Sequence, residues 1–167
     1  MRRNVLALFL VLVAASFAAA QSSSPGRPPN QPPPDKMKAG IAHFEKAFYD
    51  LTPHKRDVEA AAEFDQALAS FEAALADTPR SVEAHTYLAR IYTVKKDFKK
   101  AAEHYDQVAA IEPANVDACV LAALSFVDAG NVPEARLRLV EARARTSDPA
   151  ALEKLDEYVA KLDALKR

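Results

Sequence analysis

The feature that most constrains this chain is a similarity to itself at an offset of 34 residues, the spacing of Ala67, Ala101 and Ala135. Shifting residues 88–113 by that offset places apolar residues opposite apolar residues at a series of spaced positions. The other matching sets are Leu88 with Ala122, Ala89 with Ala123, Tyr92 with Phe126, Tyr105 with Leu139 and Phe71, Val108 with Ala142 and Ala74, and Pro113 with Pro79. A fixed period of this length is typical of arrays of repeated helical units.

Each unit is predicted to be a pair of helices. Apolar and charged residues alternate at helical spacing on both sides of Lys96-Asp97, and Pro113 ends the stretch. Ala89 and Ala101 are small enough to let the two helices approach closely. Half of the residues are apolar and only three are glycine, as in helical domains. The helices are expected to begin after three good N-caps, Ser81, Asn115 and Asp148.

The period, the small residues at the helix crossing, the aromatic residue late in the first helix and the closing proline together resemble the tetratricopeptide repeat. The positions that depart from the family's pattern are His85 and Cys119 in place of tryptophan, Lys96 where the next repeat has Gly130, and Ser147 in place of the closing proline. The resemblance implies an all-α fold, a right-handed array of helical hairpins with about three repeats and a C-terminal capping helix.

The predicted helical domain spans residues 36–167. Its expected parts are repeats at about 36–79, 82–115 and 116–147 and a capping helix at 149–166. The first repeat is longer than the period, so we expect a helix over about 36–50, a turn at Thr52-Pro53 and a long helix over 57–77. The last helix carries an apolar stripe, formed by Leu152, Leu155, Val159 and Leu162, that would close the array. A coiled-coil contact with a partner is the alternative use of this stripe.

The N-terminal 35 residues are predicted to lie outside the helical domain. Residues 1–20 have two arginines, an apolar run and a small-residue exit, which is the layout of a secretory signal peptide cleaved after Ala20. An uncleaved membrane anchor is the alternative. Residues 21–35 hold six prolines and no large apolar residue, so a disordered spacer is expected there. We therefore expect an exported protein, periplasmic or secreted, with no stable membrane insertion after cleavage.

Charge and motifs argue against several function classes. The chain has a formal net charge of −1, which disfavours nucleic acid as a partner. The four histidines and the single Cys119 lack catalytic or metal-ligand spacing, so no enzyme activity, metal or cofactor is expected. Cys119 is predicted to pack in the core. The lysines of residues 95–100 and the arginines of residues 136–145 are expected to be solvated surface groups.

In the tetratricopeptide-repeat family, the first helices of the hairpins line a concave surface that binds a peptide or a segment of another protein. The corresponding positions here, each set on one helical face, are Glu83, Thr86, Arg90 and Thr93 and then Asp117, Val120, Leu124 and Val127. The resemblance thus implies a protein-binding scaffold whose partner the sequence does not identify. Arg90 is the candidate anchor for an anion. The alternatives are a subunit that self-associates through its end helices, a membrane-anchored assembly factor, and internal cover of this face by the closing helix.

Overall fold

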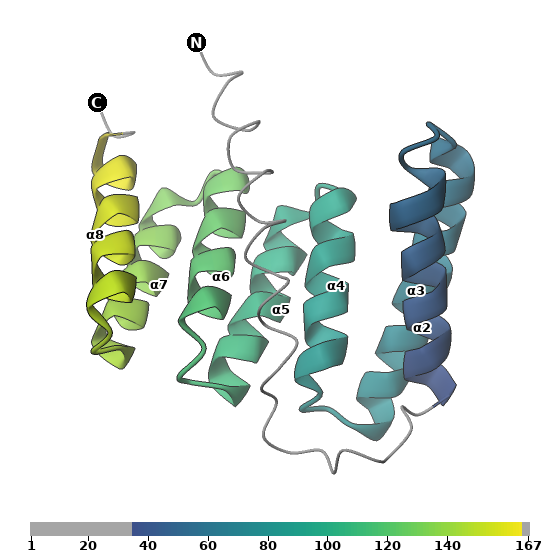
Figure 1. Cartoon of the computed structure of the whole chain (residues 1–167), viewed down its shortest axis with the longest axis horizontal. Coiled ribbons are helices and arrows are strands. Elements are labelled where there is room, and N and C mark those ends of the chain that lie inside the picture. The colour runs from purple at the N-terminus through teal and green to yellow at the C-terminus, as the bar shows by residue number, and fades with distance from the viewer. Residues whose placement is uncertain (1–34, 165–167) are drawn as a thin grey trace. The chain divides into compact units, whose positions relative to one another are not determined.

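The computed structural model describes residues 35–164, and the predicted signal peptide and residues 21–34 of the predicted spacer lie outside that range. In the described residues the helices stand side by side in chain order (Figure 1). Their bounds are α2 Asp35–Glu45, the π-helix η2 Lys46–Leu51, α3 Asp57–Asp77, α4 Val82–Val94, α5 Phe98–Ile111, α6 Val116–Asp128, α7 Val132–Arg145 and α8 Pro149–Ala164. Each helix packs against the next one along the chain, which confirms the expected all-α array of hairpins.

The period of 34 reappears in the helix bounds, since α6 and α7 begin and end 34 residues after α4 and α5. The caps repeat as well. Ser81 and Asn115 accept hydrogen bonds from the third residue of α4 and of α6, as predicted. The turns between the two helices repeat through Lys96 (φ 61°) and Gly130 (φ 80°), both of which are left-handed. Lys96 therefore adopts the backbone conformation for which its counterpart has glycine.

The first hairpin departs from the regular repeat. The helix expected over residues 36–50 begins at Asp35, and its α-helical part ends at Glu45, because η2 is wound as a π-helix. The backbone N–H and the hydroxyl of Thr52 both donate to the Ala47 carbonyl, which closes this wider turn. Lys55, with φ 56°, then reverses the chain into α3. The expected long helix over 57–77 is confirmed, and so is the extent of the helix expected over 36–50, although its last part is π-helical.

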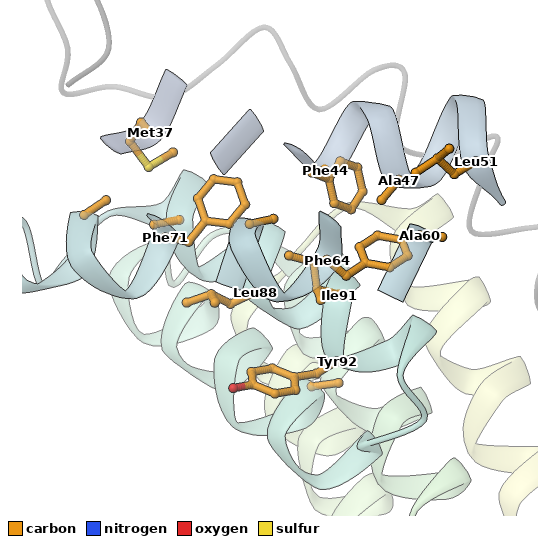
Figure 2. Close-up of a cluster of buried hydrophobic side chains, with 14 residues drawn as sticks. Met37, Phe44, Ala47, Leu51, Ala60, Phe64, Phe71, Leu88, Ile91 and Tyr92 are labelled. Carbon is orange, nitrogen blue, oxygen red and sulfur yellow. The ribbon is translucent and has the colours of Figure 1, made fainter. Parts of the chain in front are cut away.

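The core of the first hairpin and α4 is rich in aromatic side chains, as Figure 2 shows. Phe44 and Phe71 are almost fully buried, and the Phe71 ring lies directly against Gly40 of α2. A β-carbon built at Gly40 would come within 2.7 Å of that ring. Gly40 therefore allows α2 to approach α3 more closely than any other residue could.

The second core cluster joins α5, α6, α7 and α8. It contains Cys119, whose side chain is 1% exposed, which confirms the prediction of core packing. The stripe of the last helix faces this cluster, with Leu155 and Leu162 buried within it. Helix α8 packs mainly against α7, so the stripe closes the end of the array within the chain.

The arginines of α7 do more than the sequence indicated, because they are not simply solvated. Arg143 forms an ion pair of 2.7 Å with Asp156 of α8, and Arg136 forms one of 3.2 Å with Asp163 of the same helix. These ion pairs connect α7 to α8. The arginines therefore hold two helices together, in addition to any favourable effect of cations at the C-terminal end of α7. Within residues 35–164 no helix has the length and apolar character needed to span a bilayer.

Candidate binding surface on the first helices

The predicted binding positions lie on α4 and α6, and the structure gives the two helices different chemistry. The first position of each set is exposed, and the remaining six side chains are half-buried. The exposed pair is Glu83 and Asp117, and the half-buried residues are Thr86, Arg90 and Thr93 on α4 and Val120, Leu124 and Val127 on α6. The face of α4 is therefore mainly polar, whereas that of α6 is mainly apolar.

The two threonines of α4 have hydroxyl groups that already form hydrogen bonds within the helix. Thr86 Oγ1 donates to the Val82 carbonyl at 2.8 Å, and Thr93 Oγ1 donates to the Ala89 carbonyl at 2.9 Å. Each hydroxyl has only one proton to donate. These side chains therefore offer a partner acceptor oxygens and methyl groups, and no further donor.

Arg90 lies on a group of aromatic side chains that the sequence analysis did not connect with it. Its guanidinium carbon is 4.6 Å from the ring centre of Phe44, 5.5 Å from that of Phe48 and 5.8 Å from that of Tyr87. A planar cation at these distances is attracted by the ring faces. The group predicted as an anion anchor thus also helps to join α4 to α2.

The rings around Arg90 belong to a continuous run that we call the aromatic row, made of Phe71, Tyr87, Phe44, Phe48 and Tyr49. Successive ring centres along the row are 4.8, 5.1, 5.4 and 5.1 Å apart. The row runs from Phe71 in the core to Tyr49, which is 63% exposed. The Phe44 and Phe48 pair, four residues apart in a predicted helix, is the sequence signal that could have revealed its middle. The row brings an aromatic surface to the first helices.

The apolar face of α6 is partly covered from within the chain. Val120 and Val127 pack against the cluster that contains Leu155 and Leu162 of α8. Leu124 lies between them in sequence and is half-buried. Val120 and Val127 are thus partly covered from within the chain, whereas an open face at Leu124 and its cover by α8 both stay predictions.

Two histidines connect α4 to α5 beneath this surface. His85 Nε2 donates to the Pro79 carbonyl at 3.1 Å, so its Nδ1 is left to accept from the Nδ1–H of His104 at 3.0 Å. The His104 ring stacks on Tyr92 with the ring centres 5.5 Å apart. Burial, followed by the nearby His85 and Lys100, lowers the pKa of His104 to about 4.

A cavity of about 250 Å³ lies between α5, α6 and α7. Arg145 donates to Cys119 Sγ at 3.4 Å at its base, and Arg138 at its rim pairs with Asp106 at 2.8 Å. Burial raises the pKa of the Cys119 thiol, and the charge of Arg145 only partly opposes this. The thiol is therefore a poor nucleophile at neutral pH. Among residues 35–164 there is also no cluster of three or more side chains suited to holding a metal ion.

The family is decided by comparison with known proteins. Two family profiles described as Tetratricopeptide repeat match the chain, one over residues 56–116 and the other over residues 95–157. Together they cover more than half of its 167 residues. The chain is a tetratricopeptide-repeat protein. Both profiles describe a repeat that serves as a scaffold, and neither describes a catalytic family.

This tetratricopeptide-repeat protein also resembles a curated protein over a short stretch. It is 40% identical over 57 residues to the general transcriptional corepressor trfA of Dictyostelium discoideum. The aligned stretch is 34% of this chain and spans only 4% of that relative. The likeness thus concerns the repeats and not the rest of the relative.

Similar folds occur among solved structures. The first tetratricopeptide-repeat domain of Spaghetti, bound to an HSP90 peptide, is 16% identical with a TM-score of 0.47, over 74% of this chain and 95% of that one. A C-terminal domain of an FK506-binding protein of Plasmodium falciparum is 20% identical with a TM-score of 0.49, over 83% of this chain and 98% of that one. The N-terminal domain of stress-induced protein-1 of C. elegans is 15% identical with a TM-score of 0.49, over 74% of this chain and 97% of that one.

Proposed function

We propose that this tetratricopeptide-repeat protein is an exported scaffold that binds a segment of another protein along the first helices of its hairpins. The observation that carries the proposal is the half-exposed surface of α4 and α6. Val120, Leu124 and Val127 present apolar surface there, beside the polar face of α4. Half-exposed apolar side chains in a row on one helix face are typical of a surface that a partner completes.

Leu124 is the residue whose substitution tests this proposal. The change Leu124→Asp places a charge in the apolar row, and a bound partner would have to desolvate that charge without compensation. We expect partner binding to weaken at least tenfold, with a melting temperature close to that of the parent. Val58→Asp is the matched control, because Val58 is 85% exposed on α3 and lies outside the proposed surface. A large loss of stability with unchanged binding at low temperature would instead assign Leu124 to the internal contact of α8.

Export is the second part of the proposal and rests on residues 1–20. Their basic start, apolar run from Val5 to Val13 and small-residue exit favour cleavage after Ala20. N-terminal sequencing of the protein from the periplasmic or culture fraction should therefore begin at Gln21. Recovery of a membrane-bound form that still carries Met1 would contradict export and favour the alternative of a membrane-anchored assembly factor.

Self-association is a second candidate function, and one observation on α7 favours it. Leu137 and Val140 lie three residues apart on this helix and are 47% and 45% exposed. Two large apolar side chains on one helix face could pack against a second copy. Analytical ultracentrifugation over a hundredfold range of concentration would show a rising mass if this contact forms. The variant Val140→Lys should then remain monomeric, and a mass independent of concentration would reject this candidate.

A further inference from the structure

Two exposed carboxylates stand beside the aromatic row, on which the guanidinium of Arg90 already lies. Glu45 at the end of α2 and Glu83 at the start of α4 are exposed, and no ion pair within residues 35–164 includes either. The nearby Glu63 differs, since it contacts His43 at 2.6 Å and Lys46 at 2.5 Å. Glu45 and Glu83 are therefore available to a cation from outside.

Both carboxylates act on the same group of the aromatic row. Burial raises the pKa of the Tyr87 phenol, the negative charge of Glu83 and that of Glu45 raise it further, and Arg90 opposes them. The geometry agrees, since Glu83 lies one helical turn before Tyr87 on α4 and Glu45 directly follows Phe44, whose ring centre is 5.1 Å from that of Tyr87. The two acids, one from α2 and one from α4, thus border one patch of surface.

The aromatic row supplies the other half of this patch. Tyr49 is 63% exposed and packs edge-on against Phe48, so aromatic surface reaches the solvent beside Glu45. The position of Arg90 shows that a guanidinium is well accommodated on these rings, at 4.6 Å from the centre of Phe44. Ring faces and carboxylates attract the same kind of ligand group, a cation on an apolar stem.

We propose that the aromatic row with Glu45 and Glu83 binds a segment of a partner protein that carries a lysine or arginine next to an apolar side chain. This inference rests on the proposed function and names the chemistry of its ligand. An acidic segment would meet two carboxylates of its own sign, and a wholly apolar segment would desolvate them without a partner. The whole chain points the same way, because without Arg2 and Arg3 it has 20 basic and 23 acidic residues.

Selection from a random library of twelve-residue peptides tests the inference and does not require the partner to be identified. The bait is protein purified from expression of the full chain, and enriched peptides are synthesised for measurement of their dissociation constants by fluorescence polarisation. The test variant carries Glu45→Gln and Glu83→Gln. Its matched control carries Glu103→Gln and Glu153→Gln, since these carboxylates are also exposed and outside the ion pairs of the described residues. Circular dichroism verifies that both variants are folded.

Enriched peptides should contain a lysine or arginine beside an apolar residue. Their affinity should fall roughly three- to tenfold in the test variant, stay unchanged in the control, and weaken as salt is raised. Tyr49→Ala should reduce it by roughly threefold through loss of ring surface. Acidic or uncharged winners, or equal affinity for the test variant and its control, would overturn the inference.

The same selection separates this inference from the function on which it rests. Peptides that lose affinity with Leu124→Asp but bind the glutamine pair normally would support the scaffold and overturn the basic-ligand assignment. Peptides that are insensitive to both changes would bind elsewhere and would overturn both. Sensitivity to the glutamine pair and to Tyr49→Ala supports the inference at the patch bordered by α2 and α4.

Discussion

Replacing His104 should change how the stability of this protein depends on pH. The pKa of His104 is lowered to about 4 in the folded chain, against an ordinary value of 6.5, mainly through burial and then through His85 and Lys100. Below pH 6.5 the unfolded chain therefore binds a proton that the folded chain does not. Stability is full above pH 6.5, falls as the pH drops toward 4, and changes little from this group below that.

The size of the effect follows from these two pKa values. Between pH 7.5 and pH 5 the difference in proton binding amounts to about 2 kcal/mol of unfolding free energy at most. His104 keeps part of its surface in contact with solvent, so we expect about half of that, roughly 1 kcal/mol. The groups that face the ring are His85 and Tyr92 of α4 and Lys100 of its own helix. Tyr92 in turn contacts Glu72 of α3 at 3.4 Å.

The assay is urea unfolding at pH 7.5 and at pH 5, followed by helical circular dichroism. His104→Asn keeps an N–H donor for His85 and cannot titrate, so it should be less stable at pH 7.5 but lose about 1 kcal/mol less than the parent on acidification. His54→Asn is the control, because the His54 side chain is 69% exposed. An equal acid-induced loss in the parent and in His104→Asn would refute the assignment of this pH dependence to His104.

Three further substitutions test the packing and the turns. Gly40→Ala should destabilise the protein by about 1–3 kcal/mol in urea unfolding, because the new methyl group would lie 2.7 Å from the buried Phe71 ring. An unchanged midpoint of urea unfolding would contradict that contact. Ala135→Leu should cost a similar amount, since Ala135 is fully buried at a helix crossing, and a more stable variant would mean that space remains there. Lys96→Gly should stabilise the protein by up to about 1 kcal/mol in thermal melting, because glycine adopts the left-handed φ of 61° without strain. A lower melting temperature would show that the extra conformational entropy of glycine in the unfolded chain outweighs this relief.

The regular part of the fold could be predicted from the sequence because local signals and the period agree there. Ser81 and Asn115 are N-caps in the structure, and Lys96 and Gly130 both form left-handed turns 34 residues apart. The helix cap, the turn and the apolar face of a helix are each determined by residues that are close together in the sequence. The same agreement placed the starts of α4 and α6 directly after their caps.

The first hairpin could not be predicted in the same detail. Its extra length has no counterpart at the offset of 34, so neither the π-helical turn of η2 nor the left-handed Lys55 left a periodic signal. The aromatic row was missed for a different reason. Phe71, Tyr87 and Phe44 come from three elements, and their stacking depends on how those elements pack rather than on spacing within one helix. The binding positions on α4 and α6 remain predictions that the partner experiments will decide.

The last helix can be understood as half of a fourth repeat. Adding 34 to the start of α6 at Val116 gives residue 150, and α8 begins one residue earlier at Pro149. Helix α8 thus takes the place of the first helix of a fourth hairpin. The residues that surround its buried stripe are charged and exposed: Glu153, Asp156, Glu157 and Lys161. Another hairpin would have to desolvate these charges to dock on this helix, so the chemistry of its surface opposes an extension that its register would allow.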